Sequence, residues 1–163
     1  IQNKIVISVG TNLGNRKSNL EKALKLIEQK CDITQVSKIY ESEPWGYNSV
    51  NNYLNMGVVL QSYQTPIELL EFLKSIEVKM GRDIYDKNTG YHDRVIDLDI
   101  LLYGDQKVCM NQLVIPHPKI IHRKFSLFIL KDLFQDNVVP VFNKTPESML
   151  IETSDNSDVS ILN

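Results

Sequence analysis

The amino-acid sequence predicts an α+β fold in which an antiparallel sheet carries its helices on one face. The main observation is the order of elements along the chain: strand, helix, strand, strand, helix, strand. That order is typical of the split βαβ, or ferredoxin-like, arrangement. The chain has 163 residues, of which 42% are hydrophobic, and this suits a single domain with one core. A C-terminal extension follows the predicted sheet.

The first elements are predicted from short patterns. Residues 4–10 form a β-branched run that ends in glycine, which indicates a strand. After the turn-rich residues 10–15, apolar residues recur at the spacing of an amphipathic helix: Leu20, Ala23, Leu24 and Ile27. Residues 32–40 are predicted as a strand. Residues 41–52 predict a long loop, and long loops in small domains often carry function.

The next strand and helix have clearer patterns. Residues 53–61 alternate, with Leu54, Met56, Val58 and Leu60 on one side and Tyr53, Asn55 and Gly57 on the other. Thr65 and Pro66 then predict the N-cap and first residue of a helix that Gly81 ends. Residues 95–103 predict a strand, and a short strand follows near residues 107–110.

The remainder of the chain is predicted as an extension of the same domain, so that residues 1–163 form one unit. It contains a loop with Pro116, His117 and Pro118, and then a helix over residues 125–134. Beyond about residue 143 the composition turns to Thr, Ser, Asp and Asn, so we expect this tail to be peripheral.

Charge, hydropathy and cysteine content limit the kinds of partner and compartment that suit this chain. The formal net charge is −2, whereas a nucleic-acid-binding domain usually needs a basic face. No apolar run approaches the ~20 residues of a membrane helix. Cys31 and Cys109 lie far apart, so we interpret them as reduced core residues of a cytoplasmic protein. The start at Ile1 is compatible with a trimmed N-terminus or with one module of a longer polypeptide.

The most informative segment is residues 94–102. On a strand, alternate residues would form an apolar face toward the helices: Ile96, Leu98, Ile100 and Leu102. Asp97 and Asp99 would project from the opposite face, roughly 7 Å apart. Two neighbouring carboxylates repel each other, and a bound cation removes that repulsion. Hard oxygen ligands favour Mg²⁺, and the spacing suits two ions about 4 Å apart. The alternative is a pair of solvated Asp residues, although Asp is depleted from strand interiors.

Other residues indicate what lies beside this predicted metal site. Tyr53 and Asn55 lie on the polar side of their strand and suit a planar, hydrogen-bonding heterocycle. Arg82, Arg94 and Arg123 suit a polyphosphate, because guanidinium groups bind phosphate oxygens in pairs. Neither a Walker A motif nor a Gly-x-Gly-x-x-Gly motif is present, which excludes a P-loop or Rossmann nucleotide site.

Taken in order, these motifs resemble the 6-hydroxymethyl-7,8-dihydropterin pyrophosphokinase (HPPK) family of folate biosynthesis. The resemblance spans residues 5–134. Its motifs are the glycine loop at residues 10–14, Tyr53-Leu54-Asn55, Glu77 with Gly81-Arg82, Arg94-x-x-Asp97-Leu98-Asp99-Ile100, and Pro116-His117 with Arg123-x-Phe125. The Arg-x-x-Asp-Leu-Asp-Ile string is the most distinctive of them.

The resemblance implies that ATP donates its β,γ-pyrophosphoryl group to the hydroxymethyl oxygen of the pterin and leaves as AMP. It implies two Mg²⁺ ions on Asp97 and Asp99, with the active site on the sheet face opposite the helices. The implied catalytic residues are Arg82, Arg94, Asp97 and Asp99. The implied pterin-binding residues are Ser42, Pro44, Trp45, Tyr53, Asn55 and Phe125. The implied ATP-binding residues are Glu77, Arg82, Tyr91, Arg94, Ile100, His117 and Arg123.

The sequence departs from the commoner family pattern at several positions, among them Ile84, where Arg is frequent, and Lys74, where Gln is frequent. Ser42-Glu43-Pro44-Trp45 stands where Thr-Pro-Pro-Leu is usual, and Tyr91-His92-Asp93-Arg94 stands where Trp-Gly-Pro-Arg is usual.

Residues 83–93 lack a hydrophobic period and are predicted to form a lid that closes over bound ATP.

Two other functions are alternatives. One is a ferredoxin-like binding module without catalysis, for instance an RNA-binding domain, which needs aromatic side chains within a basic face. Two Asp residues on that face would instead repel phosphate. The other is a Mg-dependent phosphotransferase that acts on a different alcohol, which remains open if only the metal site is accepted.

Overall fold

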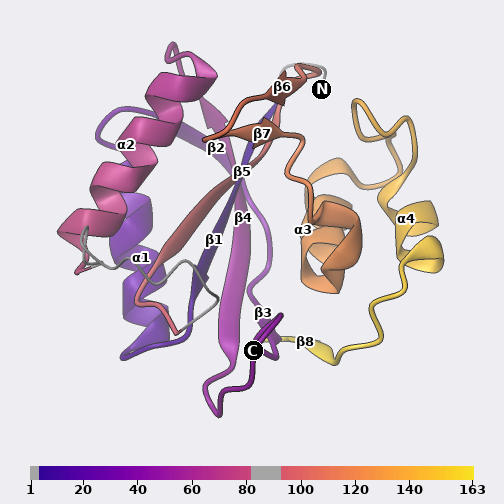
Figure 1. Cartoon of the computed structure of the whole chain (residues 1–163), viewed down its shortest axis with the longest axis horizontal. Helices are drawn as coiled ribbons and strands as arrows, with labels where there is room; N and C mark the ends of the chain where they lie inside the picture. The colour runs from indigo at the N-terminus through magenta and orange to yellow at the C-terminus, as the bar shows by residue number, and fades with distance from the viewer. Residues whose placement is uncertain (1–3, 82–92) are drawn as a thin grey trace.

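The computed structural model describes residues 4–81 and 93–163. In this part of the chain, a six-stranded sheet lies between two pairs of helices (Figure 1). The strands of this sheet are β1 (Ile5–Thr11), β2 (Asp32–Val36), β3 (Tyr40–Ser42), β4 (Tyr53–Gln61), β5 (Asp97–Tyr103) and β8 (Val159–Ile161). The helices are α1 (Arg16–Ile27), α2 (Pro66–Lys79), α3 (Lys124–Phe134) and α4 (Pro146–Glu152), with a 3₁₀ turn η1 at Ile120–His122. A separate hairpin joins β6 (Val108–Cys109) to β7 (Val114–Ile115).

The strands lie in the order β5-β1-β4-β3-β8, and β2 also pairs with β4. Every pairing is antiparallel. The predicted antiparallel sheet of an α+β protein is therefore confirmed, whereas its assignment to the ferredoxin-like class stays a prediction. The order places β1 between β5 and β4, so residues of β5 and β4 flank β1 on its two sides.

The single strand predicted for residues 32–40 was wrong, because β2 and β3 are separate strands along β4. Ser37 lies between them, and its two hydrogen bonds to Gly57 take the place of regular strand pairing. Its backbone N–H donates to the carbonyl oxygen of Gly57 at 2.8 Å, and its Oγ accepts from the Gly57 N–H at 2.7 Å. The chain is thereby pinned to β4 at the point where it turns.

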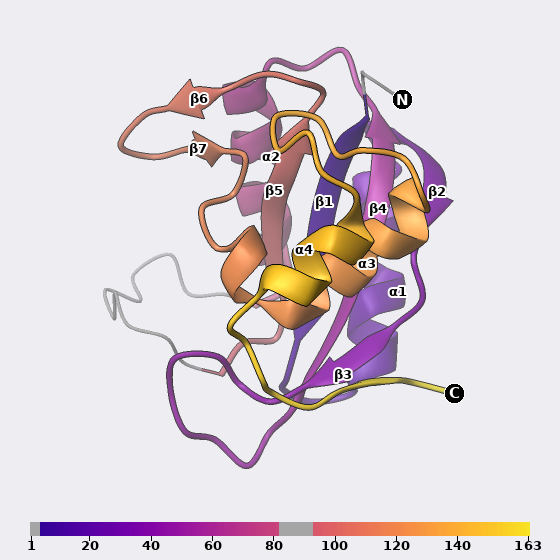
Figure 2. The same ribbon diagram turned by 90° about the vertical axis from the view of Figure 1, so that its right-hand side faces the viewer.

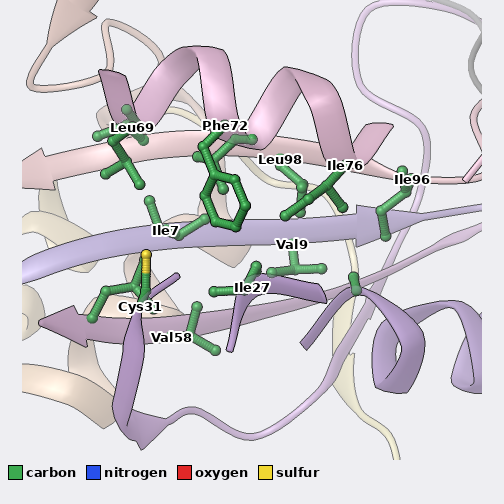
Figure 3. Packing of buried hydrophobic residues seen from close by; sticks show 14 of the residues in the cluster. Ile7, Val9, Ile27, Cys31, Val58, Leu69, Phe72, Ile76, Ile96 and Leu98 are labelled. Atoms are coloured by element: carbon green, nitrogen blue, oxygen red, sulfur yellow. The ribbon is translucent and has the colours of Figure 1, made fainter. Parts of the chain in front are cut away.

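One face of the sheet packs against α1 and α2, as the alternating patterns predicted. Ile7, Val9 and Leu98 meet Ile27 of α1 and Ile76 of α2 in one buried cluster (Figure 3). α2 also begins as predicted: Thr65 caps it, with Pro66 in the first turn. Glu68 completes a reciprocal capping box, in which the Thr65 N–H donates to Glu68 Oε2 at 2.9 Å.

The other face is covered in part by α3, with α4 outside it, as Figure 2 shows from that side. The prediction of helices on one face therefore holds for α1 and α2 alone. α3 approaches closely because β4 has a glycine beneath it. A Cβ atom at Gly57 would lie 2.2 Å from Cγ2 of Ile129, so only glycine fits without displacing the helix.

The register of β5 changes partway along its pairing with β1. The shift lies between Val6 and Ile7, so that Ile7 faces Ile100 while Val6 faces Leu102. Leu102 consequently lies in the cluster under α3. The prediction that Leu102 shares an apolar face with Leu98 was wrong, because a strict alternation cannot reveal a bulge.

The end of the chain has more structure than its composition indicated. Met149 of α4 is buried, and β8 pairs with β3 at the edge of the sheet. Cys31 is buried as predicted, but Cys109 is exposed on the β6–β7 hairpin, so the prediction of two core cysteines was half wrong. Neither cysteine is bonded to another. In the described residues, every helix is too short or too polar to cross a membrane.

Candidate active site

The two predicted metal ligands share the floor of a cavity on the α3 side of the sheet. Asp99 pairs opposite Ser8 of β1, and Asp97 pairs opposite Gly10. Both partners are small, which leaves room above the carboxylates. A side chain at position 10 would crowd β4, since its Cβ would lie 3.1 Å from Oδ1 of Asn55. β1 thus carries small residues beside both carboxylates.

The cavity has a volume of about 290 Å³ and is lined from all sides of this end of the sheet. Its lining comes from β1, β4, β5, the β3–β4 connection and the segment that leads into α3. The lining residues are Ser8, Gly10, Ser42, Glu43, Trp45, Tyr47, Tyr53, Asn55, Arg94, Asp97, Asp99, His117, Pro118, Lys119, Arg123 and Phe125.

The surroundings of Asp99 disfavour the charged form of its carboxyl group. Burial raises the pKa of Asp99 to about 8, with repulsion from Asp97 adding to it and Arg123 opposing it. Arg94 contacts Asp97, with Nη1 3.3 Å from Oδ1. In the described residues, no group of three or more His, Cys, Asp and Glu side chains is placed to hold a metal. The two carboxylates of Asp97 and Asp99 offer the hard oxygen donors that suit an ion such as Mg²⁺, which takes its other ligands from water and phosphate.

One wall of the cavity suits a flat ring. Asn55 is buried and donates through Nδ2 to Oγ of Ser42 at 2.8 Å, so its amide orientation is fixed. Tyr53 lines the same wall, and Phe125 lines the cavity from the start of α3. These residues offer aromatic faces together with an oriented amide, which is the chemistry that a planar heterocycle requires.

Another part of the lining carries cations. Lys119 Nζ lies 4.5 Å from the centre of the Trp45 ring, and the Arg123 guanidinium carbon lies 4.9 Å from it. The buried Nε of Arg123 has no hydrogen-bond partner among the described residues. Burial, with the nearby Arg123, lowers the pKa of His117 to about 4. His117 is therefore neutral at pH 7, and its Nδ1 accepts the Lys119 N–H at 3.2 Å.

Most of the site residues predicted from sequence meet in this cavity. The structure brings together Ser42, Trp45, Tyr53, Asn55, Arg94, Asp97, Asp99, His117, Arg123 and Phe125. Pro44 lies beside the lining residues without joining them. Arg82, Tyr91 and most of the predicted lid lie outside the described residues. The roles of all these residues stay predictions.

Two predicted ATP-binding residues lie elsewhere. Glu77 is buried on α2, where its Oε2 accepts the Leu98 N–H at 3.0 Å and supports β5 from beneath. Ile100 is buried in the core between the sheet and α2. Neither lines the cavity.

Six lining residues were not among the predicted site side chains: Ser8, Gly10, Glu43, Tyr47, Pro118 and Lys119. Ser8 follows the alternation of β1, and its position opposite Asp99 could have been found only from the register. Tyr47 lies in the long loop, and Lys119 lies in an irregular segment, so neither belongs to a periodic pattern.

The cavity combines two carboxylates of the antiparallel sheet with the cationic side chains of Lys119 and Arg123. This combination suits an enzyme that transfers phosphate groups. A family model described as 7,8-dihydro-6-hydroxymethylpterin-pyrophosphokinase (HPPK) matches residues 6–135. A 2-amino-4-hydroxy-6-hydroxymethyldihydropteridine pyrophosphokinase of Bacillus subtilis (strain 168) is 36% identical over 137 residues, covering 83% of this chain and 80% of that protein. The chain belongs to the HPPK family and is a pyrophosphokinase. The resemblance that the sequence motifs indicated is thus confirmed.

Longer relatives carry the same unit. The Folate synthesis bifunctional protein of Arabidopsis thaliana is 39% identical over 131 residues, which are 80% of this chain and 27% of that protein. The solved structure of Plasmodium falciparum HPPK-DHPS wild type with pteroate matches with a TM-score of 0.74 at 19% identity. That match covers 92% of this chain and 42% of the other, and it shows the fold alone. Fusion to other folate-pathway enzymes therefore occurs among the relatives.

Proposed function

We propose that this chain transfers the β,γ-pyrophosphoryl group of ATP to the hydroxymethyl group of 6-hydroxymethyl-7,8-dihydropterin in a Mg²⁺-dependent reaction of cytoplasmic folate biosynthesis. One observation carries the proposal: a single cavity joins a ring-binding wall at Asn55 to a carboxylate pair at Asp97 and Asp99. The hydroxymethyl oxygen would form a bond to the β-phosphorus, and the bond from that phosphorus to the α-phosphate oxygen would break. The products are the pterin diphosphate and AMP.

The pterin end of the cavity would select the ring by shape and hydrogen bonding. Tyr53 and Phe125 would contact its two faces, because stacking on a planar base contributes about 1–3 kcal/mol for each aromatic contact. Asn55 would bond its edge, since Ser42 already fixes the amide direction. The backbone of residues 42–45 would complete that edge. These contacts hold the hydroxymethyl group toward the Asp residues.

The phosphate end would orient ATP against that group. Asp97 and Asp99 would hold Mg²⁺, which when bound neutralises phosphate charge and polarises the transferring group. The guanidinium of Arg123, whose Nε lacks a partner in the described chain, would bind phosphate oxygens together with Arg94. Neutral His117 would offer a hydrogen bond without adding charge. Arg82 and Tyr91 are proposed as further ATP contacts on the basis of the family resemblance.

The direct test is the product balance of the purified chain with ATP and Mg²⁺, with and without the pterin. We expect AMP and pterin diphosphate in equal amounts, and no AMP when the pterin is omitted. Formation of ADP and a pterin monophosphate would contradict the proposal, and so would equal activity toward an unrelated alcohol. A calorimetric titration of pterin in the presence of a non-hydrolysable ATP analogue and Mg²⁺ would separate an enzyme complex from an RNA-binding module, which should show no pterin binding.

A further inference from the structure

The carboxylate of Asp93, at the entrance to β5, gathers donors from two other parts of the chain. Its Oδ1 accepts from Asn12 Nδ2 and Tyr47 OH, each at 2.9 Å. Its Oδ2 accepts from Asn51 Nδ2 at 2.8 Å and Ser49 Oγ at 3.0 Å. Three of these four donors belong to the β3–β4 loop, so one side chain ties down most of that loop.

Asn12, at the end of β1, completes this network and is itself buried. Its Nδ2 also lies 3.0 Å from the carbonyl oxygen of Asn51. Its Oδ1 accepts the Arg94 N–H at 2.7 Å, and its own N–H donates to the Arg94 carbonyl at 3.0 Å. The end of β1, the loop and the start of β5 are thereby locked together.

The charge of Asp93 matches these donors. Burial alone would raise the pKa of its carboxyl group, but hydrogen bonds from Asn51, Ser49 and Tyr47 bring the pKa below its ordinary value. Hydrogen bonds to a charged acceptor are stronger than those between neutral groups. The network therefore favours an ionised Asp93 and a fixed loop.

This network reaches the cavity without entering it. Asp93 does not line the cavity, but its partner Tyr47 does. The hydroxyl of Tyr47 lies 3.2 Å from that of Tyr53 on the ring-binding wall. On the other side, Arg94 directly follows Asp93 in the chain and contacts Asp97.

We propose that Asp93 is a positioning residue, which holds the β3–β4 loop and the Tyr47–Tyr53 pair in the geometry that accepts the pterin. The inference rests on the proposed function, because it names the ring as the ligand of that wall. A loop fixed in advance loses less conformational freedom on binding, and so binds its ligand more tightly. Asp93 stands where the commoner family pattern has a proline, a residue without a side-chain acceptor, whereas in this chain the charged acceptor of Asp93 fixes the loop.

The test is Asp93→Asn, which places an amide N–H₂ against the amide donors of Asn12 and Asn51. We expect the KM for the pterin to rise about tenfold, as the loss of a charge-assisted hydrogen bond would produce, while the KM for ATP changes by less than about twofold. Asp132→Asn is the matched control. Asp132 also accepts two bonds, from Tyr40 OH at 2.7 Å and the Lys38 N–H at 3.0 Å, but it lies beside a different hollow. It should leave both KM values unchanged.

A second measurement does not depend on turnover. Amide hydrogen exchange of residues 47–51 in the ligand-free protein should be faster in Asp93→Asn than in the wild type, and unchanged in Asp132→Asn. Asn51→Ala should raise the KM for the pterin in the same direction, and it should add little in the Asp93→Asn background.

The outcomes distinguish a failure of the positioning role of Asp93 from a failure of the proposed function. If the wild type turns over the pterin but Asp93→Asn has an unaltered pterin KM, or if both KM values rise equally, the positioning role is refuted. Unchanged exchange in the loop refutes it as well. If the wild type does not use the pterin at all, the proposed function fails, and the exchange rates then show only whether Asp93 fixes the loop.

Discussion

The two faces of the sheet use the same strands for different purposes. Toward α1 and α2, the strands present an apolar surface that includes the buried residues Val9, Leu98 and Ile100. Toward α3 the surface is divided. One end is apolar, with Leu102 packed beneath α3, while the other end opens into the cavity with Asp97 and its neighbours.

This difference shows how a small domain separates stability from function. Successive residues of a regular strand point to opposite faces, so residues 97–100 of β5 alternate between the cavity and the core. Leu98 and Ile100 pack β5 against α2. This packing fixes the backbone that carries Asp97 and Asp99, whose carboxylates point to the cavity. The comparison predicts that substitutions on the two faces have different signatures.

The largest expected effect is on the cavity face. Asp97→Ala should lower turnover by about a thousandfold, because the removed charge stabilises the transferring group, yet the melting temperature should not fall. Removal of Asp97 also relieves its repulsion of Asp99. Steady-state assays with thermal melts measure both quantities. Asp105→Ala, at an exposed turn, is the control, and near-wild-type turnover by Asp97→Ala would remove the metal assignment.

The apolar half of the same face should behave in the opposite way. Gly57→Ala should destabilise the fold by about 1–3 kcal/mol, since its Cβ would overlap Ile129. Chemical denaturation measures this change. The double variant Gly57→Ala/Ile129→Ala should be less destabilised than the sum of the single variants. Additive losses would show that the contact between β4 and α3 is not the cause.

The two ends of the cavity can be distinguished in turn. Phe125→Ala and Tyr53→Ala should each weaken pterin binding by about 1–3 kcal/mol and leave ATP binding nearly unchanged. Calorimetry with each ligand separately measures the two affinities. Loss of ATP affinity with retained pterin affinity would mean that the two subsites have been assigned the wrong way round.

The smallest effect concerns His117. Its folded pKa, about 4, lies below the ordinary value of 6.5, so the unfolded chain binds more protons between these pH values. Stability from this group is present above pH 6.5 and is lost as the pH falls toward 4. We expect a loss of about 1 kcal/mol between pH 7.5 and 5.5 that His117→Gln removes. His122→Gln, at an exposed position, should keep the wild-type profile.

How much the sequence could predict depended on the kind of pattern. Strand β4 and the capping of α2 are local features, and both were predicted closely. The floor of the cavity followed from the alternation in β5, once Asp97 and Asp99 were placed on a strand. The division between β2 and β3 and the bulge beside Leu102 depend on pairing with other strands, which alternation along one strand does not encode.

The remaining features of the site come from irregular segments. Asp93 was seen in the sequence only as the end of the predicted lid and as a departure from a family pattern, since its four donors are spread over residues 12–51. Trp45 was predicted to bind the pterin, yet its contacts with Lys119 and Arg123 link segments far apart in the chain. Such contacts arise from tertiary structure and have no periodic signature.

The most direct test of the separation between faces compares Asp99 with its neighbour Ile100. Asp99→Asn should lower turnover at least a hundredfold without lowering the melting temperature, because its carboxylate is strained by burial. Ile100→Ala should destabilise the fold by about 2–5 kcal/mol, while the molecules that remain folded keep a turnover within about threefold of the wild type. Thermal melts and turnover per folded molecule, measured on the same samples, give both values. Loss of stability in Asp99→Asn, or a hundredfold loss of turnover in folded Ile100→Ala, would contradict the account.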